Sequence, residues 1–217
     1  EFLMYAEDWD ALSDEGRKAF ERFPNETSFL EMASVGEFNL KRLDKVLEIC
    51  NLVLEKAPSD SSKTLRALST MGDIYHQMGD AKKAYKAYEK ALKYNPDNGT
   101  VLNNLAYEYS LEGRNLDKAL EMVERALELS ANNPTFLDTK AWVLYKLGRY
   151  AEAKKVMQYA ISLDRSKSPE YALHYGDILH ALGEEFMAKT YWRKALERGA
   201  DKEEIERRFL PQTEKKK

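Results

Sequence analysis

The sequence predicts an all-α protein, a solenoid of about five helix–turn–helix repeats with a partial repeat before them and a short closing helix after them. Three periodic observations support this prediction. A turn glycine recurs at intervals of 34 or 35 residues, at Gly79, Gly113, Gly148 and Gly183. A small residue follows the same rhythm in the first helix of each pair, at Gly72, Ala106, Ala141 and Gly176. The second helices carry a large side chain in register between two alanine columns, at Tyr88, Val123, Met157 and Trp192. Small residues let helix backbones approach closely, and large side chains fill the space beside them.

Residues 134–167 show the repeat unit most clearly. The first helix places apolar residues every three or four positions, at Leu137, Ala141, Leu144 and Leu147. This spacing puts them on one face of the helix. The second helix does the same at Ala153, Val156, Met157 and Ala160. Gly148 lies just past the first helix, where a left-handed backbone ends a helix and glycine adopts it without steric cost. Because so small a pair cannot bury its apolar stripe alone, we expect neighbouring pairs to stack.

The periodic pattern resembles the tetratricopeptide repeat (TPR) family. The shared features are a period near 34, a leucine and then a glycine or alanine in the first helix, a turn glycine, and two alanines often followed by a proline. The resemblance covers nearly the whole chain and implies a right-handed TPR-type α-solenoid. In such a stack the first helices line the inside of the curve and the second helices face outward.

The repeat columns divide the chain in order. We predict a single solenoid domain over 1–210 and a disordered tail over 211–217. The segments of the solenoid are a partial repeat at 1–26, full repeats at 27–60, 65–98, 99–133, 134–167 and 169–202, and a closing helix at 203–210. In the partial repeat, 2–5 are expected to end a first helix and 9–23 to form a second helix. Half a repeat at the start indicates a fragment of a longer solenoid, with further repeats and any targeting segment upstream.

Three places depart from the common pattern. Lys41 replaces the turn glycine of the first full repeat, which leaves the geometry of that turn open. Residues 59–64 exceed the usual junction, so we predict a lengthened loop in which Asp60 or one of the two serines after it caps the next helix. One extra residue near Arg114 and Asn115 enlarges the internal turn of the third repeat.

Composition excludes several classes of function. The 217 residues are 43% apolar and 33% charged, with a formal net charge of -3. We therefore expect no nucleic-acid partner, because binding nucleic acid needs a basic face. The single cysteine, Cys50, excludes an internal disulfide and a cysteine-based zinc site. Cys50 falls in the large-residue column of its second helix, where we expect it to be buried. No apolar run approaches the roughly 20 residues that a membrane span needs.

The sequence also carries little that indicates chemistry. It has no glycine-rich phosphate loop, no nucleophile elbow and no HExxH motif. His174 and His180 share a helix with Asp177, but the two histidines lie about 120° apart around it, because each helical residue turns by about 100°. They cannot both ligate one ion. We therefore expect no enzymatic activity, no metal and no cofactor.

The better candidate site is a surface on the first helices. Positions there that are not used for packing are expected to point into the concave groove and to bind a partner. The selected residues are Asp73, His76, Asn103, Asn104, Tyr107, Asp138, Trp142, Tyr145 and Asp177. The two asparagines offer donors and acceptors to a peptide backbone. The aromatic residues among them are the anchors that dominate peptide-binding energies. The alternative is that Trp142 and Tyr145 pack between neighbouring repeats.

A narrower resemblance concerns residues 99–200. The runs at 102–107, 137–145 and 174–179 resemble the C-terminal repeats of TPR lipoproteins in Gram-negative envelopes. This resemblance implies an adaptor on the periplasmic side of the outer membrane, where such proteins bring envelope enzymes or assembly factors together. It also implies a lipid anchor upstream of Glu1.

Functions from different classes remain open. The leading one is a non-catalytic scaffold or adaptor that binds a peptide or protein of unknown identity in its groove, in a bacterial cell envelope. The alternative is a regulatory TPR module of a longer enzyme or sensor whose active domain lies outside this chain, and self-assembly is a third option. Capture of chaperone tails is not expected. Co-chaperone TPR domains, which this architecture resembles, use basic clamp residues at the places where this chain has Asp73, Asn104, Thr135 and Thr139.

Overall fold

The computed structural model describes residues 6–209, and these form twelve α-helices joined by short turns. The helices are α2 (Trp9–Arg22), α3 (Ser28–Asn39), α4 (Leu43–Lys56), α5 (Ser61–Gln77), α6 (Ala81–Ala91), α7 (Gly99–Glu112), α8 (Leu116–Leu129), α9 (Pro134–Lys146), α10 (Tyr150–Leu163), α11 (Pro169–Ala181), α12 (Glu185–Glu197) and α13 (Lys202–Phe209). The all-α class predicted from the sequence is confirmed. The predictions for residues 2–5 and 211–217 lie outside the described residues. No helix within 6–209 is both long enough and apolar enough to cross a bilayer.

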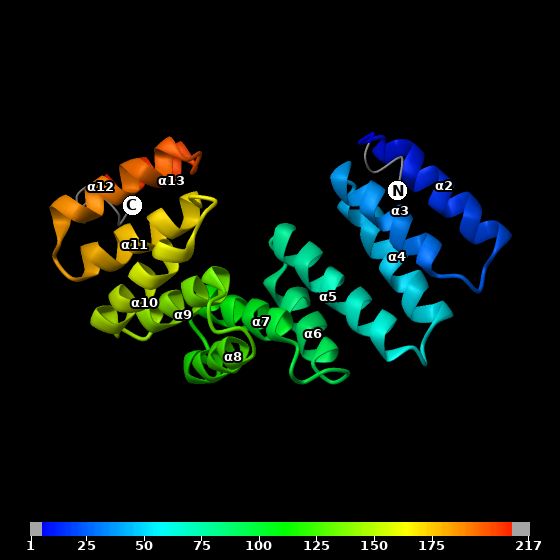
Figure 1. Cartoon of the computed structure of the whole chain (residues 1–217), viewed down its shortest axis with the longest axis horizontal. Helices are drawn as coiled ribbons and strands as arrows, with labels where there is room; N and C mark the ends of the chain where they lie inside the picture. The colour runs from blue at the N-terminus through cyan, green and yellow to red at the C-terminus, as the bar shows by residue number, and fades with distance from the viewer. Residues whose placement is uncertain (1–5, 210–217) are drawn as a thin grey trace. The chain divides into compact units, whose positions relative to one another are not determined.

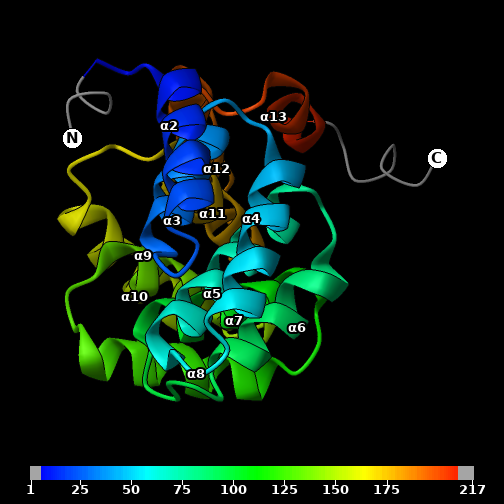
Figure 2. The same cartoon turned by 90° about the vertical axis from the view of Figure 1, so that its right-hand side faces the viewer.

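The chain divides into two compact units, and the division falls within α7. The first unit ends at Glu108 and the second begins at Tyr109. In the first unit α2 packs against α3, α3 against α4, α4 against α5, and α5 against α6 (Figures 1 and 2). In the second unit the same succession runs from α8 to α12, and α13 packs against α12 (Figure 1). Each unit is therefore a series of consecutive helices packed side by side, as expected for stacked pairs.

The lengthened loop predicted over 59–64, which placed the start of the second full repeat at residue 65, is wrong. Helix α5 already begins at Ser61, and Asp60 caps it by accepting a hydrogen bond from the backbone N–H of Lys63 at 3.0 Å. The polar run that looked like a loop is thus an N-cap followed by an additional helical turn. Serine and aspartate favour both loops and helix N-termini, so composition alone does not separate the two.

The turns between paired helices depend on a left-handed backbone. Gly79, Gly148 and Gly183 have φ of 74°, 75° and 77°, as the period predicts. Lys41 adopts φ of 58° at the corresponding place in the first full repeat. The turn geometry is therefore kept without glycine, in a conformation that costs an L-amino acid about 1–2 kcal/mol. The enlarged turn after α7 uses two left-handed residues, Gly113 at 65° and Asn115 at 49°.

Replacing Lys41 by glycine is expected to stabilise the protein. Glycine relieves the left-handed strain but loses more backbone entropy on folding, so we expect a net gain of about 1 kcal/mol in the free energy of unfolding. Urea unfolding followed by circular dichroism measures this change. Lys41→Ala is the matched control, because alanine removes the same exposed side chain and keeps the strain. An equal gain in both variants would show that the backbone conformation is not the cause.

Small residues in the core mark places where two elements approach closely. A Cβ atom on Gly36 of α3 would lie 2.6 Å from the backbone oxygen of Trp9 in α2. A Cβ atom on Gly72 would overlap the ring of Tyr88, and one on Gly176 would overlap the indole of Trp192. Tyr88 and Trp192 are almost fully buried, with 2% and 1% of their surface exposed. The predicted alternation of small and large columns is confirmed in these pairs.

Candidate functional site

The residues selected from the sequence all lie on first helices, and they form one set in each unit. In the first unit they come from α5 and from the part of α7 up to Glu108. In the second unit they come from α9 and α11. The two sets are described separately below.

Asp73 organises the first set through hydrogen bonds to two other helices. Its Oδ1 accepts a hydrogen bond from the Tyr88 hydroxyl of α6 at 2.6 Å and one from Asn104 Nδ2 of α7 at 3.0 Å. The side-chain oxygen of Asn104 in turn accepts a hydrogen bond from Asn103 Nδ2 at 3.1 Å. Burial raises the pKa of Asp73, although the two hydrogen bonds from Tyr88 and Asn104 oppose the shift. This chain of contacts fixes α5, α6 and α7 against one another.

His76 and Tyr107 form the outer part of the first set. His76 Nδ1 pairs with the carboxylate of Glu108, which is only 3% exposed. The His76 ring lies edge-on to the ring of Tyr107, with 5.9 Å between their centroids. The side chain of His76 is 42% exposed, and Tyr107 is half-buried. An imidazole and a phenol therefore reach solvent together, while a buried carboxylate holds the imidazole from behind.

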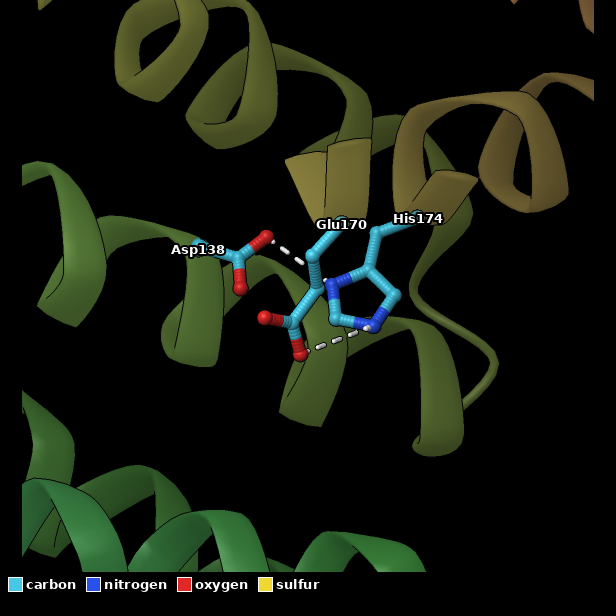
Figure 3. A group of neighbouring side chains, drawn as sticks. All are labelled: Asp138, Glu170 and His174. Atoms are coloured by element: carbon cyan, nitrogen blue, oxygen red, sulfur yellow. Dashed lines mark hydrogen bonds and ion pairs between the residues drawn. The ribbon is translucent and has the colours of Figure 1, made fainter. Parts of the chain in front are cut away.

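A buried acid–imidazole pair lies at the centre of the second set. Asp138 Oδ1 of α9 lies 2.9 Å from His174 Nδ1 of α11, and both side chains are almost fully buried. The His174 ring stacks on Trp142 at 4.1 Å, and Trp142 stacks on Tyr145 at 4.7 Å. Figure 3 shows His174 between the carboxyl groups of Asp138 and Glu170. The three-ring stack therefore bridges two successive first helices.

The charges of this pair depend on each other. Burial by itself lowers the pKa of His174, but the facing Asp138 carboxylate raises it, and the net shift is upward. Glu170 and Asp177 act in the same direction as Asp138. Burial also raises the pKa of Asp138, although His174 opposes that shift. The proton shared by the pair is thus held more tightly than in either separate group.

Asp138, Glu170 and His174 were tested as a metal site. One candidate ligand atom from each residue lies within 4.8 Å of the others. However, Asp138 lies against Nδ1 of His174, whereas Glu170 lies 4.0 Å from Nε2. The two ring nitrogens direct their lone pairs away from each other, so one ion cannot be ligated by His174 and by both acids. The arrangement instead fits an imidazole whose orientation is fixed by an acid.

Asp177 connects three helices in the second unit. Its Oδ1 accepts the indole N–H of Trp192 at 2.9 Å, and Arg208 of α13 donates to both of its oxygens at 2.8 Å. Spacing relates this cluster to the one around Asp73. The aromatic donor follows the acid by 15 residues in both clusters, and the donor from the next first helix or α13 follows by 31. Arg208 thus occupies the place that Asn104 has in the first unit.

The structure buries several residues that the sequence placed on an open surface. Asn103, Asp138, Trp142 and Asp177 are buried, Asp73, Asn104, Tyr107 and Tyr145 are half-buried, and His76 is exposed. Trp142 is 8% exposed, which agrees with the alternative that it packs between neighbouring repeats. Partner binding by these residues stays a prediction. Of the set, His76, Asn104, Tyr107 and Tyr145 combine surface exposure with fixed neighbours.

Sequence reasoning missed three residues that position these sets. Glu108 holds His76, and Arg208 holds Asp177. His174 was considered together with Asp177 and His180, yet its partner is Asp138 in the preceding repeat. The spacing of 31 between Asp73 and Asn104 was available as a signal for Arg208, because Asp177 and Arg208 repeat it. No comparable signal identifies Glu108.

Comparison with known proteins followed from this geometry. Two family models, both described as tetratricopeptide repeat, match residues 64–132 and 139–185, which together make up more than half of the chain. TPR repeat-containing protein PA4667 of Pseudomonas aeruginosa is 28% identical over 124 residues, covering 57% of this chain and 20% of that protein. TPR repeat-containing protein MJ1428 of Methanocaldococcus jannaschii is 28% identical over 196 residues, covering 83% and 34%. The chain thus spans a fifth to a third of the length of these relatives.

Solved structures share the fold. TTC0263, a thermophilic TPR protein of Thermus thermophilus, superposes with a TM-score of 0.66 at 18% identity, covering 84% of this chain and 96% of that chain. YrrB, described as a TPR protein with an unusual peptide-binding site, superposes with a TM-score of 0.63 at 19% identity, covering 90% and 98%. At these identities the likeness shows the fold alone. It confirms the TPR-like α-solenoid class predicted from the periodic columns.

Proposed function

The chain is a tetratricopeptide repeat protein, and we propose that it is a non-catalytic scaffold that binds a protein or peptide segment on the exposed parts of its first helices. The observation that carries the proposal is the surface formed by His76, Asn104 and Tyr107 in the first unit. These side chains reach solvent, and Glu108 and Asp73 hold two of them from behind. Polar and aromatic groups that are already ordered lose little entropy when a peptide docks.

Two further features support the proposal. In the second unit Tyr145 is half-buried at the end of the stack formed with Trp142 and His174, so it offers a fixed aromatic edge. Aromatic side chains supply a large contact area with few rotatable bonds. Peptide binding is also the property printed for YrrB, which has the same fold. Within residues 6–209, the acids and histidines of both sets pair with one another, with neighbouring polar groups or with α13, which suits positioning better than catalysis.

Selection of peptides from a random display library on the purified chain tests the proposal. We expect enriched peptides whose affinity falls at least about tenfold in a His76→Ala, Tyr107→Ala, Tyr145→Ala variant, because two or three anchor truncations exceed about 1.4 kcal/mol. The matched control is Tyr94→Ala, Tyr159→Ala, which removes two exposed tyrosines away from the first helices. Peptides that bind the wild type and both variants equally would contradict the assignment of this surface.

The regulatory alternative rests on a different observation. Because the chain spans only a fifth to a third of the curated relatives described above, it can also serve as the binding arm of a longer enzyme or sensor. The open reading frame around this sequence separates the two proposals. Location on the periplasmic side of a Gram-negative outer membrane, with a lipid anchor upstream, is a further proposal, supported by the sequence resemblance of residues 99–200. Fractionation of cells that express the full-length protein tests it.

A further inference from the structure

The first unit contains an apolar cavity between α3, α4 and α5. Its volume is about 190 Å³. The floor is formed by Ile49, Cys50, Val53 and Ala67, all of them buried. Burial raises the pKa of the Cys50 thiol to about 12, so this wall stays uncharged. For comparison, an engineered apolar cavity of about 150 Å³ in another protein takes up benzene.

Sequence spacing explains why the space is open. In the second full repeat the ring of Tyr88 fills the space above Gly72, and in the fifth the indole of Trp192 fills the space above Gly176. The corresponding residues of the first full repeat are Ser34 and Cys50, which hold the same positions relative to the left-handed turn residue Lys41. Both line the cavity. A thiol is too short to fill the volume that an aromatic ring fills in the other two repeats.

The polar partners of the ring have changed at the same place. The acid that follows the small residue, Asp73 or Asp177 in the other repeats, is replaced by Val35. Arg66 has the spacing of 31 that Asn104 and Arg208 have from their acids, but it pairs at 2.7 Å with Glu31 on the cavity rim. Val35 and the side chain of Arg66 are both exposed, so this side of the cavity reaches solvent. The cavity thus retains the shape of an aromatic site and lacks both the ring and the acid.

We propose that this cavity takes up an aromatic side chain, of the phenylalanine type, from a protein or peptide partner. The ring enters past Val35 and Arg66 and occupies the volume that Tyr88 and Trp192 occupy within their own repeats. A plain phenyl ring fits best, because Val35 offers no acceptor to the hydroxyl of a tyrosine, whereas Asp73 accepts from Tyr88. This inference deepens the proposed scaffold function, on which it rests, by naming one anchor of the bound segment.

N-acetyl-phenylalanine amide is the probe for a direct test. Amide chemical shifts of the ¹⁵N-labelled chain are followed while the probe is added, with N-acetyl-alanine amide as the comparison. Small ligands of this size bind an apolar pocket with a dissociation constant of about 1 mM. We expect saturable shifts confined to α3, α4 and α5, and an affinity at least about tenfold lower for the alanine probe, whose side chain leaves most of the apolar cavity unfilled.

Two variants fill the cavity from different walls. Cys50→Phe supplies the missing ring from within the chain, and Ser34→Leu narrows the space from α3. Either variant, if folded by circular dichroism, should weaken the phenylalanine probe at least about tenfold, because the ring's volume is already occupied. Cys50→Ala is the matched control, which keeps the space open and should bind the probe. Absence of shifts in the wild type, or equal binding in the filled variants, would overturn the proposal.

Other outcomes remain distinguishable. If the chain self-associates in sedimentation experiments and Cys50→Phe abolishes this, the occupant is a second copy and the proposal is overturned. If display selection yields peptides that Cys50→Phe does not weaken and the probe does not bind, the cavity assignment fails while the scaffold function stands. If no peptide is selected but the phenylalanine probe binds as expected, the cavity assignment stands while the scaffold function fails.

Discussion

Replacement of Trp192 by alanine is expected to lower the free energy of unfolding by about 3–5 kcal/mol, the range for removing a fully buried aromatic side chain. The indole is 1% exposed and fills the space above Gly176. It also donates its N–H to Asp177 and lies edge-on to Phe209 of α13 at 5.7 Å. Because Gly176 has no side chain that could move into the gap, the cavity can close only if α11 and α12 shift. Urea unfolding and hydrogen exchange of the amides in α11 and α12 measure the loss.

A control on the same helix separates packing from helix propensity. Phe186 of α12 is 80% exposed, so Phe186→Ala should change the free energy of unfolding by no more than about 0.5 kcal/mol. Trp192→Phe keeps a ring and removes the donor to Asp177, and should fall between the two. A loss below about 1 kcal/mol for Trp192→Ala, at the bottom of the range for point mutants, would show that the small and large columns do not form the rigid contact described above.

Introducing valine at Gly36 should cost about 3 kcal/mol, at the upper end for inserting atoms into a packed core. The added Cβ would lie 2.6 Å from the Trp9 oxygen and 2.8 Å from the Ser13 nitrogen, which are both backbone atoms of α2. A side chain could rotate away from such a contact, but a helix backbone cannot. Helices α2 and α3 would therefore separate along their length. Thermal and urea unfolding of the first unit measure the effect.

The neighbouring residue supplies the control for this second variant. Phe38 is 44% exposed on the same helix, and Phe38→Val introduces the same β-branched side chain without touching α2. It should change the free energy of unfolding by no more than about 0.5 kcal/mol. If Gly36→Val and Phe38→Val behave alike, α2 and α3 do not approach in solution as closely as the structure indicates.

The fold could be predicted because close packing leaves a periodic trace in the sequence. Gly72 and Gly176 must be small, and Tyr88 and Trp192 must be large, so each contact fixes two positions at a constant spacing. The start of α5 could not be predicted in the same way. Its first turn lies beyond the apolar columns, and Asp60 caps a helix there as readily as it would begin a loop.

The candidate site could be predicted only in part, because polar contacts carry no such period. The spacing identified the first helices correctly, but it treated Trp142 as a side chain directed to solvent. Whether that indole is covered depends on His174, one repeat later, and His174 in turn is oriented by Asp138. A contact between side chains on different repeats depends on the exact stacking of the helices, which periodicity does not determine.

The replacement of an acid by Val35 also affects how the first unit bears mechanical load. At Asp73, a carboxylate shielded from water ties α5 to α6 and α7 at once. At Val35 the corresponding tie is missing, and the Glu31–Arg66 contact between α3 and α5 is a surface ion pair that contributes at most about 1 kcal/mol. Pulling on this unit therefore strains its two junctions unequally. The one beside Val35 yields first and acts as the compliant element of an otherwise stiff spring.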